Sequence, residues 1–286
     1  MSDWKALARL ALRGALETRR SGNVPKDVPV CVFDLAERLK LEVRFCAGGS
    51  FEGMYAKGSN VILVPSLRPP GRQAFTGAHE MGHWYFGHGS RIDELPEFAP
   101  DDRNDPEEWS ANLFAAYLLM PSWAVESSFN RRALDPKTCT TVELYAVACE
   151  LGVGYETLIQ HLRWSLRLIS PARAAELGNA TPKAIREHLL GNVATKHLVL
   201  ADVAWITGNI DLQVGHTALL PADAVVEGGE ISVIADLPAG RLVQAKKSGI
   251  ARTFLEGREW AKFVRVSRAD FEGRSLYRHL DDPDAN

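Results

Sequence analysis

The sequence lacks several features that would assign it to a common class of protein. Its cysteines include no C-x-x-C pair, which argues against a zinc finger or a disulfide scaffold and favours the reducing cytosol (Cys31, Cys46, Cys139 and Cys149). No apolar run approaches the roughly 20 residues of a membrane span. The first 22 residues carry charge throughout and predict an amphipathic helix rather than a signal peptide. A net charge of -3 gives no overall attraction to nucleic acid.

The chemistry-bearing motif lies at His79-Glu80-Met81-Gly82-His83, which reads H-E-x-x-H. Proline-free sequence predicts a helix over 73–86, and histidines at i and i+4 share one face of a helix, where both can bind one ion. Glu80 follows the first histidine and can act as general base on a metal-activated water. Taken alone, the motif is equally compatible with a metal site and with a helix that carries two histidines by chance. The surrounding sequence is needed to distinguish the two.

A catalytic zinc ion takes three protein ligands, so the motif needs one more. Most carboxylates between positions 88 and 108 are typical of a solvated acidic loop. The next helix is predicted over 107–119, with Asp105 as N-cap and Pro106 in the first turn. Glu107 and Glu108 both project onto its apolar face. Periodicity therefore leaves both open as the third ligand, and both can instead simply cap the helix N-terminus.

Together the two blocks resemble the ImmA/IrrE family of zinc metallopeptidases. Residues 75–83 are similar to the family's F-T-x-A-H-E-x-G-H helix, and residues 108–121 to its E-x-x-A-N-x-F-A-A-x-L-L-M-P helix. The resemblance covers roughly residues 28 to 165. It implies that zinc is bound by three residues (His79, His83 and Glu108), that Glu80 activates water, and that Asn112 steadies a ligand by a hydrogen bond. Ser110 departs from the family, because many members carry an acidic residue there.

The resemblance also implies a biological role. Family members cleave Xre-type helix-turn-helix repressors, which predicts a site-specific zinc endopeptidase in stress response or in mobile-element and phage-related regulation. Mn²⁺ is a possible alternative metal for this ligand set. Three alternatives stay open: a non-catalytic zinc-stabilised regulator that sequesters a repressor, the peptidase of a toxin-antitoxin or phage-defence locus, and a DNA-binding factor that uses residues 155–166. Only two cations lie on and just after that last helix, Arg163 and Arg167, which argues against DNA binding.

The chain is predicted to be α+β. A zincin-like metallopeptidase domain over 1–168 combines a small sheet, the ligand-bearing helices and a helix-turn-helix-like unit at 140–166, which is interpreted as a packing element. A helical linker follows over 169–194, and glycine-punctuated strands predict a separate β-rich domain over 195–286. By resemblance, 60–65 is the edge strand along the substrate cleft. Candidates for stabilising an oxyanion are Tyr85, His88 and Tyr117.

Overall fold

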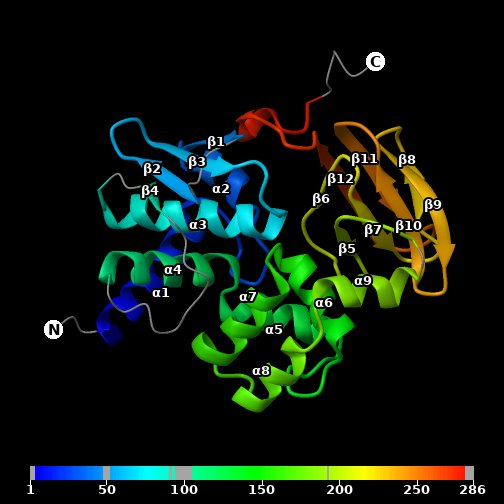
Figure 1. The fold of residues 1–286 in the computed structure, drawn as a ribbon, viewed down its shortest axis with the longest axis horizontal. Helices are drawn as coiled ribbons and strands as arrows, with labels where there is room; N and C mark the ends of the chain where they lie inside the picture. The colour runs from blue at the N-terminus through cyan, green and yellow to red at the C-terminus, as the bar shows by residue number, and fades with distance from the viewer. Residues whose placement is uncertain (1–3, 48–51, 90–91, 94–104, 192, 281–286) are drawn as a thin grey trace.

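The chain forms two regions that lie side by side in a computed structural model describing residues 4–47, 52–89, 92–93, 105–191 and 193–280. Figure 1 shows helices with a small sheet in one region and an all-β arrangement in the other. This agrees with the predicted α+β composition and its β-rich C-terminal region. Within the described residues, no helix is long and apolar enough to cross a membrane.

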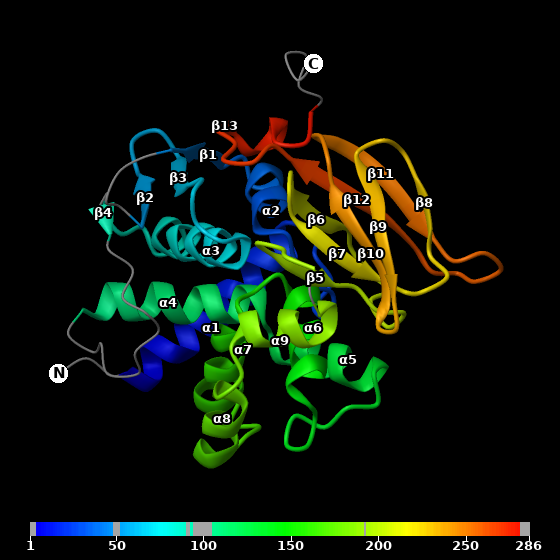
Figure 2. The same ribbon diagram turned by 45° about the vertical axis from the view of Figure 1, so that its right-hand side comes forward.

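The sheet of the first region covers the helix that carries H-E-x-x-H (Figures 1 and 2). Its strand order is β13-β1-β3-β2-β4. The five strands are β1 (Glu42–Cys46), β2 (Gly53–Ala56), β3 (Val61–Pro65), β4 (Ile92–Asp93) and β13 (Gly273–Arg274). Only the pair β1 and β3 is parallel. Because β3 pairs with β1 on one side and β2 on the other, the prediction that 60–65 is an edge strand was wrong. Alternating apolar residues identify a strand but not its neighbours.

Below the sheet, three helices are stacked in the order α3, α4, α1 (Figure 1). The helices of this part are α1 (Trp4–Ser21), α2 (Val32–Arg38), α3 (Pro70–Phe86) and α4 (Pro106–Leu119). The buried Arg19 donates to the carbonyl oxygen of Leu118 at 2.8 Å, so a charged side chain of α1 satisfies a backbone acceptor at the end of α4.

A second helical group follows in the chain. It contains α5 (Ser122–Arg131), α6 (Thr141–Leu151), α7 (Tyr155–Gln160), the π-helical turn η1 (His161–Ser165), α8 (Pro171–Gly178) and α9 (Pro182–Leu190). Thr140 and Glu143 form a capping box at the start of α6, and Gly152 ends this helix with φ of 69°. Leu144 and Leu158 are fully buried, so α6 and α7 both pack into the core of the first region.

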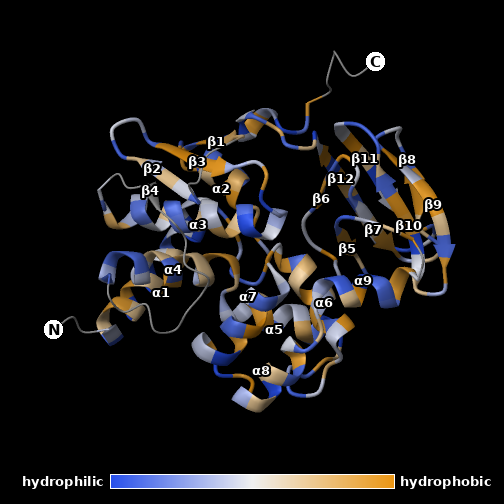
Figure 3. Ribbon diagram, viewed as in Figure 1, coloured by the Kyte–Doolittle hydropathy of each residue, from blue (hydrophilic) through white to orange (hydrophobic). Residues whose placement is uncertain are grey.

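The β-rich region contains two four-stranded sheets, with orders β5-β7-β10-β9 and β6-β12-β11-β8. The strands are β5 (Leu198–Leu200), β6 (Ile210–Gln213), β7 (Thr217–Leu220), β8 (Val225–Glu227), β9 (Ile231–Leu237), β10 (Gly240–Ala245), β11 (Gly249–Phe254) and β12 (Ala261–Ser267). Apolar residues concentrate on the strands of both regions (Figure 3). The first strand of this region ends at Leu200, because the carboxylate of Asp202 accepts from the backbone of Ala204 and Trp205 at 3.1 Å and holds a turn.

The end of the described chain returns to the first region. β13 pairs antiparallel with β1, with Arg274 opposite Arg44, and the short helix η2 (Ser275–Tyr277) follows. Arg278 then binds Asp34 of α2 at 2.7 Å. Figure 2 shows β13 beside β1, far from the β-rich sheets. The predicted domain boundaries stay predictions, but the last strand of the 195–286 segment belongs to the sheet of the first region.

Candidate metal centre

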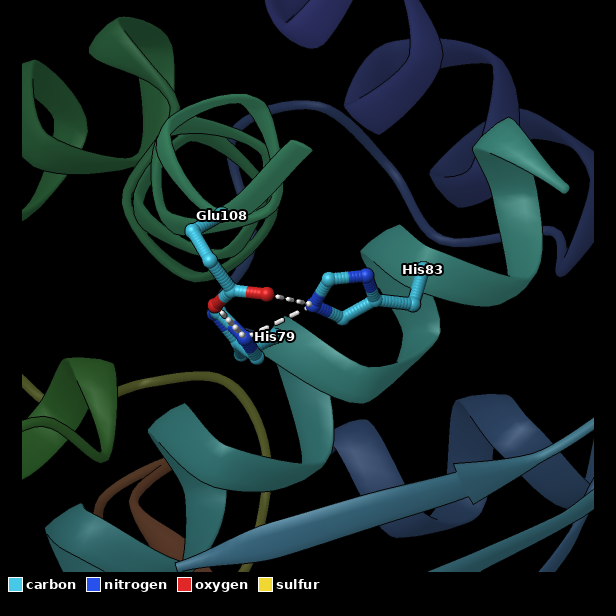
Figure 4. A group of neighbouring side chains, drawn as sticks. All are labelled: His79, His83 and Glu108. Carbon is cyan, nitrogen blue, oxygen red and sulfur yellow. Dashed lines mark hydrogen bonds and ion pairs between the residues drawn. The ribbon is translucent and has the colours of Figure 1, made fainter. Parts of the chain in front are cut away.

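Both histidines of the motif lie on the same face of α3, where their ε nitrogens point to a common position (Figure 4). The Nε2 atoms of His79 and His83 are 2.9 Å apart. The two side chains are 0% and 2% exposed, so they lie inside the protein rather than on a solvated helix face. Among the open interpretations of the motif, burial disfavours the one in which it is a chance pair of surface histidines.

The neighbouring helix brings a carboxylate to this position. Asp105 caps α4 by accepting from the backbone of Glu107 at 2.9 Å, which sets Glu108 in the first turn. The carboxylate oxygens of Glu108 lie 3.3 Å from Nε2 of His79 and 3.4 Å from Nε2 of His83. One ligand atom from each of these three residues falls within 4.8 Å of the others, and Glu107 is not part of this group. Periodicity had left both glutamates open as the third ligand. The orientation of α4 about its axis decides between them, because it brings Glu108, and not Glu107, to the two histidines.

A close approach of the two helices makes this possible. A Cβ atom added to Gly82 would lie 3.1 Å from the Cα of Ala111 and 3.2 Å from the ring of Phe114. This contact is tighter than nearly all real Cβ contacts, so a larger residue would push α4 away from α3. Glycine is a poor helix former, and this close approach explains its position within α3: a lower helix propensity allows the two helices to lie nearer to each other.

The δ nitrogens of both histidines have polar partners behind the site. Nδ1 of His79 lies 3.0 Å from Oδ1 of Asn112, the contact predicted for that asparagine. With the amide oxygen as acceptor, Nδ1 carries the hydrogen, so the neutral imidazole can offer the lone pair of Nε2 to a metal ion. Nδ1 of His83 lies 2.9 Å from Nδ1 of His88. Such contacts fix the orientation and tautomer of a metal-binding imidazole.

Glu80 lies beside the cluster under strand β2. The side chain is 1% exposed. A Cβ atom added to Gly53 would collide with Oε1 of Glu80 and would lie 2.7 Å from Cγ2 of Thr76. Gly53 therefore lets the strand backbone approach the carboxylate. Sequence reasoning missed this residue, although a glycine within a strand is a recognised sign of close approach.

The three candidates for stabilising an oxyanion are engaged elsewhere. Tyr85 donates to Glu17 of α1 at 2.6 Å, and this hydrogen bond raises the pKa of Tyr85. The ring of Tyr117 packs edge-on against His161, and burial raises the pKa of its hydroxyl. The third candidate, His88, contacts His83 as described. Their described contacts therefore point to packing and positioning, and the role of oxyanion donor gains no support from them.

The donor set fits a divalent metal ion. Burial alone would raise the pKa of Glu108, but hydrogen bonding to His79 and the proximity of both histidines lower it below the usual value. A carboxylate that stays ionised beside two imidazole nitrogens is the ligand chemistry of mononuclear zinc enzymes. The arrangement is also the only group of three or more His, Cys, Asp or Glu side chains within metal-binding distance among the described residues.

Comparison with known proteins agrees with the sequence motifs. The family model for the IrrE N-terminal-like domain, Peptidase_M78, matches residues 36–163. No curated protein matches the sequence. A solved structure of a Mycobacterium tuberculosis transcriptional regulator aligns with 55% of this chain and 46% of its own, at 19% identity and a TM-score of 0.34. The alignment thus spans less than half of that regulator. Residues 36–163 thus match the IrrE N-terminal-like peptidase domain, in agreement with the resemblance to the ImmA/IrrE family that the two motifs carry.

Proposed function

We propose that the protein is a metal-dependent endopeptidase with His79, His83 and Glu108 as its metal ligands. The observation that carries the proposal is the convergence of two imidazole nitrogens and one carboxylate in a buried position. Three protein ligands leave room for water, as in catalytic rather than structural zinc sites, which are usually closed by four. Zinc is the proposed metal, and Mn²⁺ fits the same ligands.

A bound zinc ion would supply Lewis-acid activation of a water molecule and of the scissile carbonyl group. Glu80 is the proposed general base. Its carboxylate takes a proton from the attacking water and returns it to the leaving amine nitrogen. Gly53 lies against this carboxylate, so the backbone of β2 limits the positions it can take.

The proposed substrate is a helix-turn-helix repressor of the Xre type, as the family resemblance implies. Its cleavage would release the genes that the repressor silences, in stress response or in mobile-element or phage-related regulation. The same chemistry would serve a toxin-antitoxin or phage-defence locus. A metal-stabilised regulator that binds the repressor without cutting it is the alternative, and it requires an intact metal cluster but no role for Glu80.

The test is cleavage of the helix-turn-helix protein encoded beside the gene. Wild type with Zn²⁺ or Mn²⁺ is expected to cut it at one bond, and a chelator to stop the reaction. Glu80→Gln should keep the metal and slow cleavage by about 100- to 10,000-fold, the usual contribution of a general base. The matched control is Glu107→Gln, which removes a carboxylate outside the metal group.

Each outcome separates the two proposals. Wild-type turnover by Glu80→Gln would refute the assigned base. Tight metal-dependent binding without any cut would favour the sequestering regulator. If neither cleavage nor binding is observed, that helix-turn-helix protein is excluded as the partner.

A further inference from the structure

A second hollow lies away from the metal cluster, where the two regions meet. It is a cavity of about 830 Å³, a size typical of small-molecule sites. α2, the first turns of α3 and the turn between α6 and α7 line it from one region, and β6 and β12 from the other. None of the residues of the metal cluster lines it. Ligand sites occur preferentially at such junctions between structural units.

Polar groups in the cavity wall lack partners. Ser66 is 2% exposed, and within the described part of the chain its hydroxyl oxygen is buried without a hydrogen-bond partner. The same holds for the hydroxyl of Thr207, across the cavity in the β-rich region. Buried hydroxyls nearly always have a partner in folded proteins. Both residues belong to the wall of one cavity, so protein atoms alone leave polar groups of this wall unsatisfied.

Cationic side chains outnumber carboxylates in the lining of the cavity. Six cationic side chains face only three carboxylates, although the whole chain carries -3 (Arg38, Arg72, Arg186, Lys196, Arg265 and Arg278). The carboxylates are already engaged: Asp34 and Asp211 bind Arg265 at 2.6 Å, and Glu150 binds Arg132 at 2.5 Å.

Three of the six cations form no ion pair with a described carboxylate, and one of the three, Arg38, donates to the carbonyl oxygen of Gly22 at 3.1 Å. No described carboxylate forms an ion pair with Arg186, which is half-buried on α9, or with Lys196, which is exposed before β5. The N-terminus of α3 adds its partial positive charge on the opposite side, because its first turn also lines the cavity. The surroundings therefore favour an anion.

Much of the remaining wall is apolar. Aromatic rings from both regions contribute to it, namely Phe33, Phe75, Tyr155, Trp205 and Phe271. An inorganic ion would leave most of this surface in contact with water. A molecule with an apolar body and an acidic group would cover it.

We propose that this cavity is a binding site for an organic anion, a carboxylate or phosphate attached to an apolar or aromatic body. The acidic group interacts with Arg186 and Lys196. The ligand also contacts the first turn of α3. Binding at this site does not depend on the metal cluster or on peptidase activity.

The test uses the full chain and anilinonaphthalene sulfonate, a fluorescent aromatic anion, as the probe. Wild type is expected to bind one probe molecule saturably. The double variant Arg186→Gln/Lys196→Gln should weaken binding by about ten-fold or more, as loss of a charged partner predicts. The control Arg9→Gln/Lys183→Gln removes the same two residue types from exposed positions outside the cavity and should leave the affinity unchanged. Equal affinities in all three proteins would overturn the proposal.

A second variant guards against effects on folding. The variant Arg186→Lys/Lys196→Arg keeps a cation at both positions and should bind the probe with an affinity close to that of wild type, so a loss confined to the glutamine variant reports charge rather than folding. Competition then defines the head group: displacement by octanoate identifies a carboxylate, and displacement by naphthyl phosphate identifies a phosphate. Octanol and inorganic phosphate should not compete. Equal competition by octanol would refute the anionic part of the proposal.

Discussion

Two pairs of neighbouring histidines, one in each region, differ in what surrounds them. The rings of His79 and His83 are 4.7 Å apart in the first region, and those of His197 and His216 are 4.9 Å apart in the β-rich region. The first pair has Glu108 within 3.4 Å of both rings. No third metal-binding side chain joins the second pair in the described residues.

The electrostatic environment of the second pair opposes positive charge. Burial lowers the pKa of His197 to about 4, with His216 and Arg186 acting in the same direction. Burial and then Lys196 lower the pKa of His216 to about 4, against a smaller opposing effect of Asp270. Proximity of imidazoles is thus not enough to make a metal site. The carboxylate and the hydrogen-bond partners behind the rings distinguish the first pair.

The largest expected difference is in metal affinity. His79→Ala removes one of three ligands and should weaken zinc binding by more than the roughly 100-fold that loss of a supporting hydrogen bond causes. His216→Ala removes the corresponding member of the other pair and should leave zinc content unchanged. Zinc titration against a competing chelator measures both. An equal loss of zinc in the two variants would remove the distinction between the pairs.

The next effect concerns catalysis without loss of metal. Gly53→Ala places a methyl group against the carboxylate of Glu80. Because displacement of a catalytic group by about 1 Å can cost 100-fold in rate, cleavage should fall by roughly that factor while zinc affinity holds. Gly58→Ala is the matched control, since no atom lies within 4 Å of the added methyl group. Full activity of Gly53→Ala would show that Glu80 tolerates the shift.

The hydrogen bond behind His79 should have a smaller effect on the metal than the ligand itself. Asn112→Ala removes the acceptor of Nδ1 and should weaken zinc binding by about 10- to 100-fold. Asn112→Asp keeps an acceptor at this position and should restore most of the affinity. If the two variants show the same zinc affinity in the chelator titration, the contact with Asn112 does not orient the imidazole of His79.

The smallest effect lies in the second pair and depends on pH. Folding holds His197 and His216 neutral, with folded-state pKa values of about 4 against 6.5 in the unfolded chain. Their contribution to stability is therefore complete above pH 6.5 and is lost as the pH falls toward 4. Between pH 7.5 and 5, the double variant His197→Gln/His216→Gln should lose less unfolding free energy than wild type in urea titrations. Identical losses would contradict the buried neutral state.

The sequence predicted the metal cluster better than its surroundings, for a physical reason. The ligand spacing in α3 and the cap of α4 are local, so they can be read from a few residues. The choice between Glu107 and Glu108 depends on how α4 is rotated against α3, and only family resemblance anticipated it. The positions of Gly53 and His88 depend on packing between distant segments, as does the central position of β3 in its sheet. No periodic pattern records such contacts.

The pairing of β13 with β1 brings the chain back to the first region after it has formed the β-rich sheets. A strand that follows the whole β-rich region completes the sheet above the metal helix, and Arg278 then bridges to Asp34 of α2. The two regions thus cannot be separated by a single cut at the linker without exposing one edge of β1. Proteolysis between α9 and β5 would give two fragments that stay associated, and fragment exchange would measure how strongly the return strand holds them.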